Sequence, residues 1–242
     1  MRLEILYEDN HCLVVSKPAG LLSQADATGD PCLVELARDD LKARYRKPGN
    51  VYLALLHRLD RPTSGAVLLA RTSKAAARLA AQFRAGTVQK LYWAIVEGRP
   101  PELAEGEWTD VVRKERALNR VEIVKPETSG GRIARVAYRV QWREEGLAKL
   151  ELRPLTGRGH QLRVQLAHRG MPIVGDRKYG ARIALKAEGG RRRIALHARE
   201  LRFRHPTRGE EIAVVAPVPA DWPEFWPGWR ERPSGSGKPR GN

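Results

Sequence analysis

Cysteine is scarce in this sequence: Cys12 and Cys32 are the only two among 242 residues. Two cysteines form at most one disulfide and cannot make a four-cysteine zinc site. No uncharged run approaches the roughly 20 apolar residues of a transmembrane helix. The opening residues, MRLEILYEDNH, carry charges where the apolar region of a signal peptide would lie. We therefore expect a soluble, cytoplasmic protein with no membrane partner.

The motifs of several enzyme classes are missing as well. No two histidines have the HExxH spacing of zinc proteases, and no GxxxxGK[ST] loop of a P-loop ATPase occurs. Ser64 lies outside any GxSxG motif, although a serine hydrolase that uses Ser64 stays an alternative. Gly157 and Gly159 begin a GxGxxG pattern, but Leu162 takes the place of its third glycine. The sequence thus predicts neither a metal site nor a dinucleotide cofactor.

Acidic residues are few relative to basic ones. The chain has 44 Lys and Arg residues against 28 Asp and Glu residues, a formal net charge of +16. Such an excess attracts polyanions, with nucleic acid ahead of an anionic membrane surface. Arginine accounts for 33 of the basic residues. A guanidinium binds phosphate through two hydrogen bonds and stacks on bases, which suits RNA, although a GC-rich genome explains the arginine excess equally well.

Hydrophobic periodicity predicts one mixed α+β domain over residues 1–232, followed by a disordered basic tail at 233–242. We expect strands at 3–7, 12–16, 67–70, 88–96, 132–143, 148–152 and 211–216, and helices at 32–46, 73–86 and 160–169. Ser73 is the expected N-cap of the second helix. The strand at 132–143 alternates between apolar residues and arginines, which predicts one buried and one basic face.

Two polar clusters are candidate sites. The first, HRLDRPTSG at 57–65, has apolar residues on both sides. Burial of both flanks would hold Asp60 on a loop at the edge of the core, although a structural ion-pair network explains the cluster equally well. The second is GRGHQLR at 157–163. Its glycines let the backbone approach a ligand and the following helix start can bind phosphate, with a structural glycine turn as the alternative.

Together these segments resemble the RluA family of pseudouridine synthases. LHRLDRPTSG at 56–65 resembles its catalytic motif, VQKLYWAIVEG at 88–98 its tyrosine-bearing strand, and GRGHQLRVQLAHRGMPIVGDRKYG at 157–180 its third motif. The segments at 6–20 and 196–206 also match the way in which these domains begin and close. The first and third motifs are long and specific, and the order and spacing agree over most of the chain.

The resemblance implies a mostly antiparallel central sheet in two halves, with flanking helices and an active-site cleft between the halves. It implies that Asp60 is the catalytic aspartate, that Arg163 pairs with it, and that the ring of Tyr92 lies against the target base. Tyr92 taken by itself, in the middle of a strand, is most simply a buried structural tyrosine. The remaining residues implied at the RNA or target base are Arg58, His57, Arg61, Lys90, Arg158, His160 and Gln161, the last two mainly shaping their loop.

The implied reaction converts uridine in RNA to pseudouridine. The glycosidic bond breaks, the uracil rotates and C5 joins C1′, without a redox change, so the reaction needs no cofactor or metal. One carboxylate can start it by attacking the base or the sugar, or by taking a ribose proton. The target uridine has to leave the base stack to reach that carboxylate.

Two features depart from the family pattern. Gly159 stands where the family often has Thr or Ser, and many members carry an N-terminal S4 RNA-binding domain that we do not expect here. RNA affinity should therefore come from the domain's own surface, with Arg135, Arg139, Arg143 and the run at 191–193 as phosphate contacts. A solvated loop is the alternative for that run.

The expected partner is a stem-loop of ribosomal or transfer RNA, bound by a monomer. The form LHRLDRPTSG is near that of a transfer-RNA enzyme of the group. A non-catalytic RNA-binding or chaperone protein on the same fold is the alternative, which the joint presence of Asp60, Tyr92 and Arg163 argues against.

Overall fold

The computed structural model describes residues 3–46, 48–115, 117–144, 146–185, 192–219 and 222. Its strands are β1 (Glu4–Glu8), β2 (Cys12–Lys17), β3 (Ala54–Leu55), β4 (Ser64–Ala70), β5 (Gln89–Glu97), β6 (Glu105–Glu115), β7 (Arg120–Val124), β8 (Arg132–Glu144), β9 (Leu147–Pro154), β10 (Leu196–Arg204) and β11 (Glu211–Val215). Its helices are α1 (Leu33–Arg44), α2 (Ser73–Ala85), α3 (Gln161–His168) and the short 3-10 helix η1 (Arg177–Tyr179).

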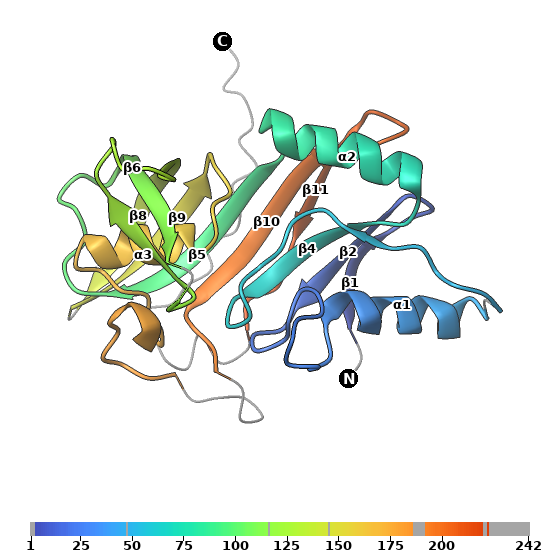
Figure 1. The fold of residues 1–242 in the computed structure, drawn as a ribbon, viewed down its shortest axis with the longest axis horizontal. Coiled ribbons are helices and arrows are strands. Elements are labelled where there is room, and N and C mark those ends of the chain that lie inside the picture. The colour runs from blue at the N-terminus through green and yellow to red at the C-terminus, as the bar shows by residue number, and fades with distance from the viewer. Residues whose placement is uncertain are drawn as a thin grey trace, which may run out of the picture.

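All the described strands join one sheet, in the order β1-β2-β4-β10-β5-β9-β8-β6-β7, with β3 paired to β4 and β11 to β10. Figure 1 shows two halves, one formed by β1, β2 and β4 with α1 and α2, the other by β5, β9, β8 and β6 with α3. Strand β10 runs between them. Its contact with β4 is parallel, whereas the other strand pairs are antiparallel. The expected two-part α+β sheet is confirmed.

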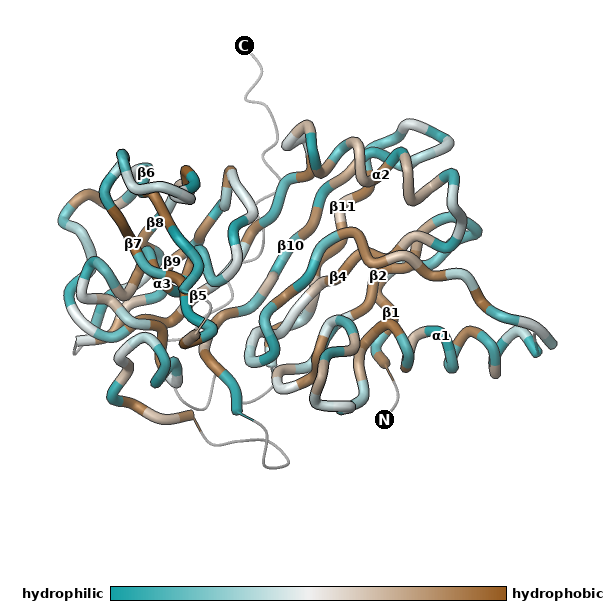
Figure 2. The backbone as a smooth tube through the Cα atoms, viewed as in Figure 1, coloured by the Kyte–Doolittle hydropathy of each residue, from teal (hydrophilic) through white to brown (hydrophobic). Residues whose placement is uncertain are grey.

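Alternating side chains give the α1–α2 half its two apolar layers. Leu13 of β2 packs with Leu41 of α1 on one face, and Val14 packs with Leu79 of α2 on the other. Both faces of these strands are covered, which is why they read as continuous apolar runs. Figure 2 shows apolar residues along β2 and β4 and hydrophilic residues on the outer turns of α1.

The two halves meet at a close backbone contact between β4 and β10. Gly65 pairs with Ala198 there, and a Cβ on Gly65 would lie only 2.3 Å from the Ala198 carbonyl oxygen. Gly65 also has a φ of +119°, a conformation that favours glycine. Glycine at this position therefore sets how closely the halves approach.

Several elements differ from the sequence-based expectations. Thr72 caps α2 in place of Ser73, because its side chain accepts a hydrogen bond from the Ala75 amide at 3.2 Å. Strands β3, β6, β7 and β10 were not predicted. Of the two longest, β6 is mostly exposed or half-buried and highly charged, and the register of β10 shifts between Ala198 and Glu200. Neither strand therefore has a clear two-residue repeat. The tail at 233–242 lies outside the described residues, and the described helices include none with the length and apolarity to cross a membrane.

Candidate active site

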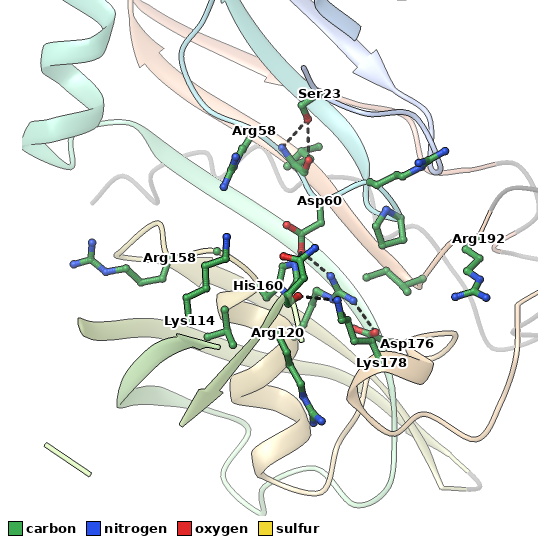
Figure 3. Close-up of a pocket in the computed structure, with 18 of the residues that line it drawn as sticks. Ser23, Arg58, Asp60, Lys114, Arg120, Arg158, His160, Asp176, Lys178 and Arg192 are labelled. Atoms are coloured by element: carbon green, nitrogen blue, oxygen red, sulfur yellow. Dashed lines mark hydrogen bonds and ion pairs between the residues drawn. The ribbon is translucent and has the colours of Figure 1, made fainter. Parts of the chain in front are cut away.

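A pocket of about 1610 Å³ has Asp60 on its wall and is lined by residues from both halves of the sheet. Twelve of its lining residues are Lys or Arg, against three Asp. Two of those three aspartates, Asp60 and Asp176, are paired with Arg163. The pocket is therefore strongly basic, with one partly exposed carboxylate near its centre (Figure 3).

Asp60 lies in the loop between β3 and β4, and its carboxylate is held from the other half of the sheet. Arg163 of α3 donates a hydrogen bond from Nη1 to Asp60 Oδ2 at 3.0 Å. The Asp60 side chain is 24% exposed, whereas that of Arg163 is 5% exposed. The structure thus brings together the two residues that the family resemblance pairs.

A second carboxylate, Asp176, fixes the orientation of Arg163. Asp176 accepts hydrogen bonds from Arg163 Nε at 2.6 Å and from Nη2 at 2.8 Å, and its side chain is only 2% exposed. Burial by itself would lower the pKa of Arg163, but the hydrogen bonds and charge of Asp176, and then those of Asp60, raise it. The guanidinium is therefore permanently charged and reaches Asp60 in one orientation.

His160 lies on the same side of Asp60 as Arg163. Its Nε2 is 3.9 Å from Asp60 Oδ2, and its Nδ1 is 2.8 Å from the Tyr179 hydroxyl. Burial lowers the pKa of His160, so the ring is neutral near pH 7. The Tyr179 hydroxyl also accepts a hydrogen bond from the Val121 amide at 2.9 Å. Tyr179 and His160 thus connect β7 to the loop that carries Asp60.

Tyr92 is half-buried on β5, where it pairs with Ala198 of β10 and Leu152 of β9. Burial raises the pKa of its phenol, and the charge of Asp60 raises it further. The hydroxyl therefore stays protonated at neutral pH, in reach of the electrostatic field of Asp60. Tyr92 does not itself line the pocket.

Several basic side chains of the pocket form no ion pair with a carboxylate of the described residues, among them Arg58, Lys114, Arg120 and Arg192. Figure 3 shows Arg58 and Lys114 pointing toward one another from opposite walls, with Arg192 on the far side of Asp60. Cations without carboxylate partners on both sides of Asp60 suit a polyanion that crosses the pocket.

The other residues implied at the RNA divide into two groups. Arg58, Arg61, Arg158 and His160 line the pocket, but His57, Lys90 and Gln161 do not. His57 accepts a hydrogen bond from the Leu68 amide at 3.0 Å and stacks on Phe83. Burial lowers its pKa to about 3, so it is neutral. These contacts turn the ring of the half-buried His57 toward α2 and β4, which gives no support to an RNA contact.

Gln161 is also occupied by the protein. Its side chain accepts hydrogen bonds from Thr156 Oγ1 and the Arg158 amide and donates one to the Arg135 carbonyl, and it is 4% exposed. Gln161 therefore shapes the loop before α3. Lys90 is half-buried next to Gly157, and burial lowers its pKa.

The arginine face of β8 lies apart from the pocket. Arg139 forms an ion pair with Glu105 at 2.8 Å, Arg143 donates to the Pro101 carbonyl at 2.6 Å, and neither they nor Arg135 line the pocket. Of the run at 191–193, Arg192 and Arg193 line it, whereas Arg191 lies outside the described residues.

Ser64, the residue of the hydrolase alternative, is 6% exposed. Its Oγ lies 2.8 Å from His197 Nδ1. The other His197 nitrogen, Nε2, is 3.3 Å from the Ala216 carbonyl, which only accepts hydrogen bonds. Nε2 thus carries the proton and Ser64 donates to Nδ1. A hydroxyl buried at the β4–β10 junction offers no approach to a substrate, so the hydrolase alternative loses its support.

Sequence reasoning missed four residues of the site: Asp176, Tyr179, Lys17 and Ser23. The first two lie in GDRKYG, inside the third motif, where nothing in the local pattern indicates which side chain each of them contacts. Lys17 is fully buried, and its Nζ donates to the carbonyls of Leu21 and Arg61. Only the three-dimensional contacts reveal these roles.

Comparison with known proteins shows which family the chain is similar to. A family model described as RNA pseudouridylate synthase matches residues 11–168. The chain is 38% identical over 231 residues to the ribosomal large subunit pseudouridine synthase D of Xylella fastidiosa, a match that covers 90% of this chain and 67% of that protein. It is 35% identical over 219 residues to the ribosomal large subunit pseudouridine synthase C of Vibrio vulnificus, covering 88% of this chain and 65% of that protein.

A solved structure gives the same result. Human RNA pseudouridylate synthase domain containing 4 superimposes with a TM-score of 0.73 at 28% identity, covering 90% of this chain and 89% of that one. The chain spans about two thirds of the length of the two bacterial relatives. It belongs to the RNA pseudouridylate synthase family, and within it to the RluA-type enzymes, which isomerise uridine in RNA to pseudouridine.

Proposed function

We propose that this chain forms pseudouridine in large-subunit ribosomal RNA, with Asp60 as its catalytic carboxylate. The observation that carries the proposal is the set of contacts at Asp60. Arg163 holds Oδ2, while Oδ1 receives no hydrogen bond from the described residues and a quarter of the side chain is exposed. One oxygen is thus fixed and the other is available to a substrate in a basic pocket. The names of the bacterial relatives support ribosomal RNA.

The bond changes of the reaction need only one such carboxylate. The N1–C1′ bond breaks and a C5–C1′ bond forms; C5 loses a proton and N1 gains one, with no oxidant or reductant. Asp60 starts this sequence by attacking the base or the sugar, or by taking a ribose proton. Each route requires a carboxylate that is held in place and reachable. The pair of Arg163 and Asp176 is neutral overall, so Asp60 supplies the net negative charge of the three.

The other roles follow from position and charge. Tyr92 keeps its proton and lies in the field of Asp60, which supports a ring that packs against the target uracil. Arg58 is exposed at the pocket, where it can hold the displaced nucleotide or fill its place in the stack. Lys114 and Arg192 flank Asp60 and are proposed contacts for the phosphates on either side of the flipped uridine.

Transfer RNA is the second candidate substrate, because the same motif resembles that of a transfer-RNA enzyme. A cytoplasmic monomer is the simplest form of the proposal. Size-exclusion chromatography at several protein concentrations tests the monomer, and a shift toward larger species with concentration would contradict it.

Pseudouridine mapping tests the function as a whole. We expect deletion of the gene to remove one or more pseudouridines from large-subunit ribosomal RNA, and wild-type protein, but not the Asp60→Asn variant, to restore them. A loss confined to transfer RNA would replace the proposed substrate. An unchanged map would instead favour the RNA-binding or chaperone alternative.

A further inference from the structure

A single serine hydroxyl holds both polar backbone groups of the residue that precedes Asp60. Ser23 Oγ donates a hydrogen bond to the Leu59 carbonyl at 2.8 Å and accepts one from the Leu59 amide at 3.1 Å. Both residues are 5% exposed, and Figure 3 shows Ser23 above the carboxylate with these two bonds. No other described residue bonds to either group of Leu59. The hydroxyl therefore replaces the strand partner that this loop lacks.

The residue that follows Asp60 is clamped by the same segment of chain. The Arg61 carbonyl accepts hydrogen bonds from the Gly20 amide at 2.7 Å and from Lys17 Nζ at 3.2 Å. Arg61 Nε in turn donates to the Gly20 carbonyl at 3.1 Å. Residues 17–23 thus fix the backbone on both sides of Asp60, while its side chain is fixed by Arg163 from the other half.

We infer that Ser23 is a positioning residue for catalysis, which sets the backbone from which the Asp60 carboxylate extends. The inference rests on the proposed role of Asp60. Asp60 takes no hydrogen bond from Ser23, so Ser23 acts only through Leu59. Removal of the hydroxyl leaves a buried amide and a buried carbonyl without partners, an unfavourable state that the loop relieves by moving its backbone toward other partners or water. A shift of about 1 Å in a reacting group lowers a rate roughly 100-fold.

Ser23 also lines the pocket, so a direct contact with RNA is the competing explanation. Its hydroxyl proton and one lone pair are already used by Leu59. If Ser23 contacted RNA, its replacement would weaken RNA binding. If it positions Asp60, its replacement would slow the chemical step in the enzyme–RNA complex. The RNA dissociation constant measures the first effect and the single-turnover rate measures the second.

The test uses Ser23→Ala, Ser23→Thr, which keeps a hydroxyl, and Thr72→Ala as a control for reduced stability away from the pocket. The substrate is a large-subunit ribosomal RNA transcript labelled with 5-tritiated uridine, in single-turnover conditions. We expect Ser23→Ala to release tritium roughly 10- to 100-fold more slowly with an RNA dissociation constant within about 3-fold of wild type, and Ser23→Thr to recover most of the rate. Thr72→Ala should lower the melting temperature and leave the rate unchanged.

A wild-type rate in Ser23→Ala would overturn the inference, as would weakened RNA binding at an unchanged single-turnover rate. Inactivity of the wild-type protein on this RNA would contradict the proposed substrate. The role of Ser23 would then be tested by a second measurement. Hydrogen exchange of the Leu59 amide needs no substrate. Faster exchange in Ser23→Ala and restored protection in Ser23→Thr support the positioning role, and equal protection in all three proteins contradicts it.

Discussion

Arg163 Nη1 lies 3.0 Å from Asp60 Oδ2, and this contact joins the two halves of the sheet at the centre of the pocket. Asp60 takes its backbone position from the half that holds α1 and its side-chain position from α3 in the other half. Any change in the approach of the halves therefore moves the carboxylate relative to its guanidinium. The geometry of the active site therefore depends on how the two halves of the sheet are packed together.

Replacement of Arg163 should remove most of the activity. In Arg163→Lys a single ammonium group cannot bond Asp60 and both oxygens of Asp176 in the geometry of the planar fork, so we expect at least a roughly 10-fold loss of rate, and a larger loss in Arg163→Ala. Tritium release from RNA labelled with 5-tritiated uridine measures it. Near wild-type turnover in Arg163→Lys would show that charge alone is sufficient.

Asp176→Ala isolates the orienting role of the second carboxylate. It leaves the Arg163 guanidinium buried with one partner, and removal of one member of a buried ion pair typically costs about 3–5 kcal/mol. We expect a large fall in the free energy of unfolding, measured by urea denaturation. A fall of less than about 1 kcal/mol would mean that Asp60 alone satisfies Arg163.

The pocket cations that have no carboxylate partner should carry the salt dependence of RNA binding. The double variant Lys114→Ala, Arg192→Ala should flatten the slope of log K against log salt by roughly 0.7–0.9 for each phosphate that the protein no longer neutralises. Arg139→Ala is the matched control, because Arg139 is exposed and paired with Glu105 outside the pocket. An unchanged slope in the double variant, or an equal change in the control, would place the phosphate contacts elsewhere.

Gly65→Ala should destabilise the protein more than a glycine substitution elsewhere. Its Cβ would lie 2.3 Å from the Ala198 carbonyl oxygen, a clash that we expect to cost about 3 kcal/mol or more. Gly86→Ala is the control: Gly86 also has a positive φ, but nothing lies within 4 Å of its Cβ position, so about 1 kcal/mol is expected. Equal melting temperatures for the two variants would contradict the close contact of β4 and β10.

Lys17 should make stability rise with pH. Burial lowers the pKa of Lys17 to about 7 from an ordinary value of 10.5, against the opposing charge of Asp60. Between these two values the unfolded chain binds more protons than the folded protein, so the free energy of unfolding increases with pH, by at most about 1.4 kcal/mol per pH unit. Lys17→Met removes this group, so the stability of wild type relative to the variant should increase between pH 7.5 and pH 9.5, roughly the middle of that window. Parallel curves from urea unfolding would contradict the shifted pKa.

Sequence alone predicted the parts of the fold that have strong periodicity and the parts of the site that lie in long motifs. The apolar runs at 12–16 and 88–96 are strands because both of their faces are covered, and Asp60 and Arg163 lie in motifs specific to the family. The N-cap of α2 was displaced by one residue, since Thr72 and Ser73 are both good capping residues and only the geometry selects between them.

The missed residues act through contacts that have no local pattern. Ser23 and Leu59 are 36 positions apart, and Lys17 bonds to backbone carbonyls, which carry no sequence signature. His57 was predicted to contact RNA from its place in the same motif as Asp60, but its ring stacks on Phe83 and accepts a hydrogen bond from the Leu68 amide, so its contacts give that prediction no support. Neighbouring residues of one loop can thus face different ways: His57 packs on Phe83, whereas Arg58 lines the pocket.

The most direct test of the account is the Asp60→Asn variant, which changes one oxygen to nitrogen and keeps the size of the side chain. We expect no tritium release from RNA labelled with 5-tritiated uridine, and an RNA dissociation constant within a few-fold of wild type, because the pocket's cations and not this carboxylate bind RNA. Circular dichroism and the melting temperature control for folding. Substantial turnover by a folded Asp60→Asn protein would contradict the assignment of Asp60 as the catalytic residue.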